Sequence, residues 1–157
     1  RGALMVALSE RISTEMKAAF LGGNRFRGDV LRNLKATILN EEVAKQKRDE
    51  GLSDGEIESV IAREVKRRTE SARLYRENNR PELAEPEEQE MAVLEEFLPE
   101  QMSEEDLRRV VEEKIANLGA NNPKDMGRVI GAVKAEVGNA ADGALLAHIV
   151  KNALTNK

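Results

Sequence analysis

The sequence predicts an all-α protein, and three observations support this fold class. Aromatic residues make up only 3% of the 157 residues, so a core would be built from Leu, Ile, Val, Ala and Met, which suits packed helices better than a β-sandwich. Apolar residues recur at three- and four-residue intervals along most of the chain, and capping residues, glycines and prolines separate these stripes. About seven helices are expected, in an N-terminal bundle with long helices over residues 1–98 and a small three-helix domain over residues 103–157.

Four of these helices are expected before Pro99. The first closes at Gly22–Asn24, and the stripe of the second fades before a stop at Gly51. The apolar stripes are Leu4, Leu8, Ile12, Met16, Ala19 and Phe20 in the first helix, and Phe26, Val30, Leu31, Leu34, Ile38 and Val43 in the second.

The third and fourth helices have recognisable start signals. Ser53 with Glu56 three residues later has the form of a capping box, and it opens a helix of roughly 25 residues that ends before Pro81. Pro81 can open the fourth helix, but Pro86 is tolerated only in a first helical turn, so the helix is expected to begin nearer Ala84 or Glu85 than Pro81. The stripes are Ile57, Val60, Ile61, Val65, Ala72 and Tyr75, and then Met91, Leu94, Phe97 and Leu98 up to Pro99.

Three further helices are expected after a boundary at Pro99–Ser103, where the proline breaks one helix and the serine caps the next. Asn122 with Pro123 is a start signal for the sixth helix, and Asp142 is a cap for the last one. The stripes are Leu107, Val110, Val111, Ile115 and Leu118; Met126, Val129, Ile130, Val133 and Val137; and Leu145, Leu146, Ile149, Val150, Ala153 and Leu154.

Two glycines stand inside the sixth helix. Gly127 and Gly131 are four residues apart and therefore share a face, and each costs roughly 1 kcal/mol relative to Ala in a helix interior. Close packing of the last two helices is the expected compensation. The alternative is a flat surface that an RNA backbone can approach.

At these residues the chain resembles the GatB/YqeY family. The resemblance rests on Asp125–Gly131, Ala141–Ala144, Tyr75–Arg76 and Leu94–Leu107, which match the YqeY-like members. It implies an all-helical protein of two parts, whose C-terminal part is similar to the tail domain of the B subunit of glutamine-dependent aminoacyl-tRNA amidotransferase. That tail contacts tRNA, and the stand-alone members have no firmly assigned activity. Members commonly carry a basic residue just before the Ala-Asp of the last helix, whereas here the run is Gly138–Asp142.

Composition excludes several classes of site. The net charge is −4 with 34% charged residues, so any nucleic-acid site must be local, and DNA is not an expected partner. The absence of Cys excludes disulfides, thiolate catalysis and cysteine-ligated metals, and the single His148 excludes a His-rich metal site; no cofactor is expected. The apolar run Gly2–Leu8 is too short for a membrane span, so we expect a cytoplasmic protein without a membrane partner.

Charge is unevenly distributed between the third helix and the segments after it. Residues 63–80 contain seven basic and three acidic side chains, a local net charge of +4, and residues 82–113 carry a local net charge of −11. The two segments are interpreted as attracting one another or as solvated faces. The alternative is a third helix that faces RNA through phosphate contacts.

In the C-terminal part the candidate nucleic-acid-binding residues are Lys124, Arg128, Lys134 and Lys151. Lys124 and Arg128 are four apart on one face, whereas Lys134 is further along and rotated away. The four basic residues are either solvated charges around a packing stripe or phosphate contacts beside a helix N-terminus. The motif and packing residues of the same region are Asp125, Gly127, Gly131 and Asp142.

The function expected from these observations is that of a non-catalytic, tRNA-associated accessory protein. Its partners would be tRNA or an aminoacyl-tRNA amidotransferase complex. The resemblance would carry a carbon–nitrogen ligase activity with glutamine as amide donor, but the chain contains no phosphate loop and no nucleophile–base pair for that chemistry. The alternative is a protein–protein adaptor that uses the acidic stretch or the apolar side of the third helix.

Overall fold

The computed structural model describes residues 7–156, which form seven α-helices and two short 3₁₀ turns without a β-strand. The prediction of an all-α fold is therefore confirmed. The chain divides into two compact units, one ending at Leu98 (unit 1) and one beginning at Pro99 (unit 2). Each unit has its own hydrophobic core and is described by itself.

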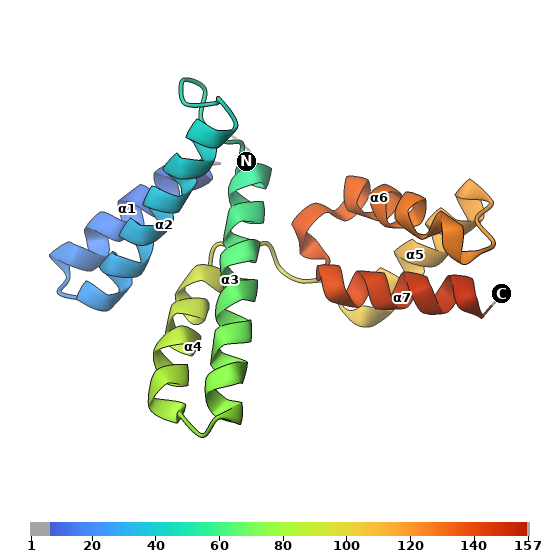
Figure 1. Cartoon of the computed structure of the whole chain (residues 1–157). Helices are drawn as coiled ribbons and strands as arrows, with labels where there is room; N and C mark the ends of the chain where they lie inside the picture. The colour runs from blue at the N-terminus through green and yellow to red at the C-terminus, as the bar shows by residue number, and fades with distance from the viewer. Residues whose placement is uncertain (1–6, 157) are drawn as a thin grey trace. The chain divides into compact units, whose positions relative to one another are not determined.

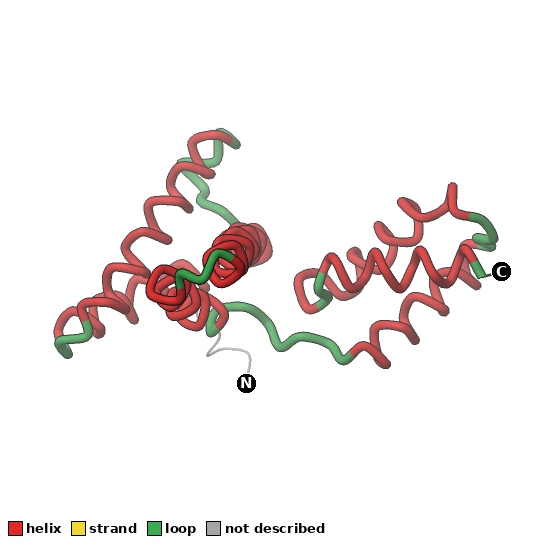
Figure 2. The backbone as a smooth tube through the Cα atoms, turned by 60° about the horizontal axis from the view of Figure 1, so that its bottom comes forward, coloured by secondary structure: helices red, strands yellow, loops and turns green. Residues whose placement is uncertain are grey.

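Unit 1 is built from two antiparallel helical hairpins (Figures 1 and 2). The first hairpin pairs α1 (Leu8–Leu21) with α2 (Arg25–Ala44), and the second pairs α3 (Asp54–Glu77) with α4 (Pro81–Glu95). The hairpins pack together over buried aliphatic side chains. The largest of these are Ile12, Leu31, Ile57, Val60, Ile61 and Leu94.

Two of the four helices of unit 1, α2 and α3, begin with a side-chain cap, whereas α4 begins with Pro81 at its first position. Asn24 Oδ1 accepts from the Arg27 amide at the start of α2, and the capping box predicted at Ser53 and Glu56 forms at the start of α3. The first helix has no cap of its own, because Ala7 precedes it. Instead, the Leu8 amide donates to Asp54 Oδ1 at 3.0 Å, so a residue of α3 caps α1.

Three residues expected in the core stripes lie at the surface. Phe20 is 36%, Phe26 41% and Val43 56% exposed, because they lie towards the ends of the hairpin helices, beyond the buried stretches from Leu8 to Ala19 and from Gly28 to Ile38. The Phe20 ring lies against Gly28 of α2, where a Cβ would come within 2.7 Å of it. Leu4, also expected in the first stripe, lies outside the described residues.

The fourth helix begins earlier than predicted. It starts at Pro81 and not near Ala84, and Pro86 lies inside it. Pro86 removes only the amide that would reach the carbonyl of Glu82, close to the helix start, and the added turn carries Ala84 into the interior, where it is fully buried.

The fourth helix also ends earlier, at Glu95, yet Phe97 beyond it is buried as expected. Arg11 lies over the Phe97 ring, 4.5 Å from its centroid, and donates to the Glu96 carbonyl at 3.1 Å. Arg27 Nη1 donates to Glu96 Oε2 at 3.0 Å. These contacts hold the end of α4 against the first hairpin.

Unit 2 is a three-helix domain of α5 (Glu104–Leu118), α6 (Met126–Val137) and α7 (Gly143–Thr155). Its core is aliphatic, and the fully buried side chains are Leu107, Val111, Val129, Val133, Leu146 and Val150. Gly119 ends α5 with φ +65°, which is the left-handed conformation that glycine adopts without strain. Within residues 7–156, no helix is long and apolar enough to cross a membrane.

Candidate functional site

The sixth helix begins with a 3₁₀ turn, which the sequence analysis did not predict. Asn122 Oδ1 accepts from the Lys124 amide at 2.9 Å and caps the turn Pro123–Asp125, so α6 proper starts only at Met126. Asp125 Oδ2 accepts from the Asn121 amide at 3.3 Å, and Asp125 Oδ1 accepts from Arg128 Nη2 at 3.1 Å. The turn is therefore closed by side chains of its own segment.

The two glycines of α6 face solvent. A Cβ built at Gly127 or at Gly131 would meet nothing within 4 Å, and both residues are exposed. The interpretation that they allow close packing of the last two helices is wrong, because the helix turns its aliphatic stripe towards α5 and α7 and its glycines away from them. At these two positions no side chain protrudes from the exposed face of α6.

Two candidate cations border this face. Gly131 is three residues from both Arg128 and Lys134, so it lies between them on the helix surface, about 60° from each. Gly127 is seven residues before Lys134 and lies about 20° from it around the helix axis. The arrangement is a small-residue strip with a positive charge on either side, which we call the α6 face (Gly127, Arg128, Gly131, Lys134).

The lysines of this region have no ion-pair partners. Among the described residues, no salt bridge or hydrogen bond engages the side chain of Lys124, Lys134 or Lys151, whereas Arg128 is paired with Asp125 and Lys114 with Glu136 (Nζ to Oε1, 2.7 Å). Lys151 lies on the exposed side of α7. Of the four candidates, Arg128 and Lys134 thus share the α6 face, Lys124 precedes it in the 3₁₀ turn, and Lys151 is on the neighbouring helix.

The last helix starts as the sequence predicts. Asp142 Oδ2 accepts from the Leu145 amide at 2.8 Å and caps α7. His148 is exposed, with its Nε2 atom 3.1 Å from Nδ2 of Asn152 one turn later.

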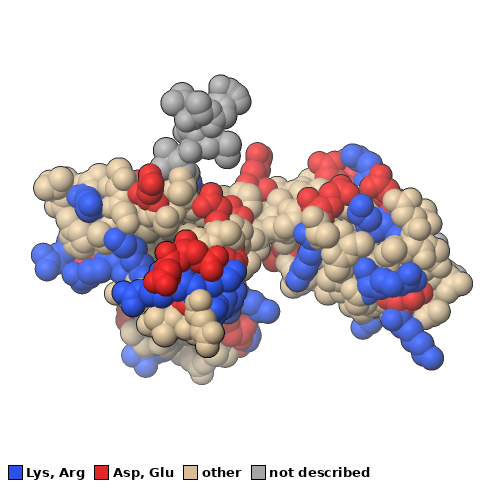
Figure 3. All heavy atoms as spheres, turned by 90° about the horizontal axis from the view of Figure 1, so that it is seen from above, with Lys and Arg blue, Asp and Glu red and all other residues tan. Residues whose placement is uncertain are grey.

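The positive charge of α3 is largely neutralised. Of the seven basic side chains between residues 63 and 80, of which all but Arg80 belong to α3, six form ion pairs, and only Lys66 has none among the described residues. The pairs are Arg63–Glu41, Arg67–Glu64, Arg68 with Glu64 and Glu90, Arg73 with Glu70 and Glu77, Arg76–Glu88 and Arg80–Glu82. Figure 3 shows basic and acidic side chains lying next to one another on the visible face of this unit. Two of these pairs, Arg68–Glu90 and Arg76–Glu88, join α3 to α4, and the remaining pairs leave few cations of this segment available to RNA.

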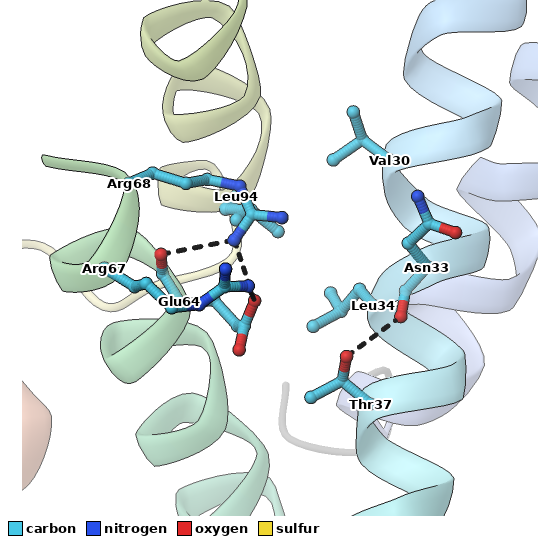
Figure 4. A pocket seen from close by; sticks show the side chains of 8 residues that line it. All are labelled: Val30, Asn33, Leu34, Thr37, Glu64, Arg67, Arg68 and Leu94. Atoms are coloured by element: carbon cyan, nitrogen blue, oxygen red, sulfur yellow. Dashed lines mark hydrogen bonds and ion pairs between the residues drawn. The ribbon is translucent and has the colours of Figure 1, made fainter. Parts of the chain in front are cut away.

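A polar cleft of about 240 Å³ lies between α2 and the second hairpin (Figure 4). Arg68, whose side chain is 14% exposed, donates to Glu90 Oε1 at 2.8 Å and to Glu64 Oε1 at 2.7 Å. Burial opposes ionisation of Glu64, but the hydrogen bonds from Arg68 and Arg67 outweigh it and lower the pKa of that carboxyl. The charged groups of the cleft are thus satisfied by one another.

Acidic side chains do not gather into a metal site in the part of the chain that the structure describes. Among residues 7–156 no group of three or more His, Asp or Glu side chains is placed to hold an ion. On the α6 face, Gly127 and Gly131 leave the helix surface open, Arg128 is paired with Asp125, and Lys134 has no ion-pair partner among the described residues.

Comparison with known proteins gives one result. The family model described as Yqey-like protein matches residues 9–154, which is nearly the whole chain. No curated protein matches the chain.

Proposed function

The chain belongs to the Yqey-like protein family, and from this premise we propose that it is a non-catalytic accessory protein that binds tRNA through unit 2. The observation that carries the proposal is the α6 face, an exposed strip of two glycines bordered by Arg128 and Lys134. The proposal assigns no bond-making step to the protein.

Charge and shape support phosphate contact at this face. Lys and Arg side chains make most protein contacts to nucleic-acid phosphates, and lysines without carboxylate partners lose no ion pair when they do so. Lys134 and Lys124 are free in this sense, whereas Arg128 would share its charge with Asp125. The glycines add no side chain between these cations, so a phosphodiester backbone can come close to the helix.

The composition of unit 2 favours recognition of shape over sequence. Residues 99–157 contain no Phe, Tyr or Trp, so unpaired bases find no aromatic side chain to stack on. Contacts limited to phosphates position an RNA helix and do not read its bases. A folded RNA with double-stranded stems is therefore a better ligand for this unit than an unstructured strand.

The choice of tRNA rests on the resemblance of the C-terminal part to the tail domain of the amidotransferase B subunit, which contacts tRNA. On this proposal the protein either holds tRNA or docks on a tRNA-modifying enzyme. A protein–protein adaptor is the second candidate, and it is favoured by an apolar groove in unit 1 that is described below.

The test is a fluorescence-anisotropy titration of bulk tRNA with the full chain, between about 50 and 200 mM salt. We expect salt-sensitive binding that the triple variant K124A/R128A/K134A weakens about tenfold or more, with a salt dependence shallower by about one unit per lost phosphate contact. An unstructured homopolymer RNA should bind more weakly than tRNA.

The matched control is K17A/R48A/K66A, which removes the same charge from three exposed residues of unit 1 that have no ion-pair partners among the described residues. Absence of binding at low salt contradicts the proposal. If the control variant weakened tRNA binding equally, net charge alone would explain the effect, and the α6 face would no longer be part of the proposal.

A further inference from the structure

The first hairpin of unit 1 carries a groove whose floor includes two residues of the core, Ile12 and Ile38. The groove has a volume of about 340 Å³ and lies between α1 and α2. Ile12, Ala36, Ile38 and Leu39 supply its apolar lining, and Lys35 and Glu42 are its charged residues. Leu39 is 39% exposed, and Val43 one turn later is 56% exposed. This face of α2 therefore presents Leu39 and Val43, which no helix among residues 7–98 covers fully.

The two charged residues are arranged symmetrically about Leu39. Lys35 lies one turn before it and Glu42 one turn after it on the same side of α2. Neither side chain has an ion-pair or hydrogen-bond partner among the described residues. An isolated helix that carries Lys, Leu and Glu at positions i, i+4 and i+7 is complementary to an antiparallel copy of itself.

We propose that this groove binds a second copy of the chain, related by a twofold axis that passes close to Leu39 and perpendicular to α2. The α2 helix of each protomer lies in the groove between α1 and α2 of the other, so the two hairpins form a four-helix bundle. Lys35 meets the partner's Glu42 at two equivalent places, and Leu39 meets the partner's Leu39 at the centre. A twofold interface requires this self-complementarity, because each residue pair occurs twice.

Residues further from the axis agree with the antiparallel arrangement. Arg32 of α2 pairs with Asp29 of its own helix, Nη2 to Oδ1 at 2.8 Å, so its charge is balanced within the protomer. Val43 falls opposite the partner's Lys35 and covers the aliphatic part of that side chain. To pair with Lys35 and Glu42, a helix of another protein would have to carry an acidic and a basic residue seven positions apart and run antiparallel to α2. A second copy of α2 already carries both residues.

The test is sedimentation equilibrium of the full chain over a range of concentrations, in which the expected species is a dimer of the 17.4 kDa protomer. K35E and E42K each create two like-charge pairs across the axis and should raise the dissociation constant by about tenfold or more. The double variant K35E/E42K restores both pairs with their signs exchanged and should return the affinity towards that of the parent. L39E should be monomeric, with unchanged helix content by circular dichroism because Leu39 is exposed in the single chain.

K66E is the matched control, since it makes the same charge change on α3, away from the groove, and should leave dimerisation unaffected. A monomer at all concentrations would overturn the proposal. A dimer that persists in L39E would place the interface elsewhere and would also overturn the proposal. The same holds if K35E/E42K does not restore the affinity that K35E and E42K each lose. The result is independent of tRNA binding, because Lys35, Leu39 and Glu42 all belong to unit 1.

Discussion

Ser53 and Glu56 cap each other's backbone at the start of α3. The Glu56 amide donates to Ser53 Oγ at 3.2 Å, and the Ser53 amide donates to Glu56 Oε1 at 2.9 Å. The second carboxylate oxygen, Oε2, accepts from Lys47 Nζ at 2.7 Å. The hydrogen bond from Lys47 and then that from the Ser53 backbone lower the pKa of Glu56 from 4.5 to about 2.

This pKa predicts a pH-dependent contribution to stability. Because the pKa of Glu56 is lower in the folded protein than in the unfolded chain, its contribution is complete above the unfolded value of about 4.5 and is lost as the pH falls through about 2. The free energy of unfolding of the parent should therefore exceed that of E56Q by a constant amount near neutral pH, and this difference should shrink between about pH 4.5 and pH 2. Urea denaturation of both proteins at several pH values measures it. A difference that stays constant across the acid range would show that ionisation of Glu56 does not stabilise the fold.

Asp54 should stabilise α1 although it belongs to α3. Its Oδ1 atom accepts from the Leu8 amide, and Ala7 offers no cap in its place. D54A should lower the free energy of unfolding by about 1 kcal/mol, as expected for the loss of a helix cap. D54N keeps an acceptor at the same position and should lose less than half of that. Equal losses in urea denaturation would attribute the effect to the charge of Asp54 and not to its acceptor.

Arg68 and Arg73 allow a comparison of a shielded and an exposed ion-pair centre on one helix. Each arginine pairs with two glutamates, but Arg68 is 14% exposed and joins α3 to α4, whereas Arg73 is half exposed and pairs with Glu70 and Glu77 of its own helix. R68A leaves two shielded carboxylates without a donor and should cost about 2 kcal/mol of unfolding free energy. R73A should cost clearly less than R68A, because solvent screens its exposed ion pairs. Similar losses in thermal denaturation of the two variants would contradict the role of the cleft in shielding Arg68.

Sequence reasoning succeeded where the cause of a structure is local. The capping box at Ser53, the cap at Asp142 and the aliphatic stripes follow from residues within one or two helical turns of each other. The resemblance to the YqeY-like members, which rests on short motifs, is confirmed by the family match over residues 9–154. Similarity to the amidotransferase tail domain stays a prediction.

The differences from the predictions arise where contacts between distant parts of the chain determine the structure. The cap that Asp54 supplies to Leu8 joins residues 46 positions apart, and the Arg68–Glu90 pair joins two helices, so neither follows from local patterns. For the ion pairs between α3 and α4, the sequence gives a signal in the opposite net charges of residues 63–80 and 82–113. The stripe positions of Phe20 and Phe26 were correct in period, but whether a stripe position is buried depends on how far the second hairpin extends over it.

Gly131 provides the most direct test of the α6 face. A glycine in a helix interior is less favourable than alanine by about 1 kcal/mol, and nothing lies within 4 Å of the position that an alanine Cβ would occupy. G131A should therefore raise the free energy of unfolding of unit 2 by about 0.5 to 1 kcal/mol, measured in urea. G119A in the same unit is the control and should lower it, because Gly119 has φ +65°, a conformation that alanine adopts only with strain. Destabilisation by G131A would mean that another backbone approaches α6 after all, and it would restore helix packing as the reason for the glycine.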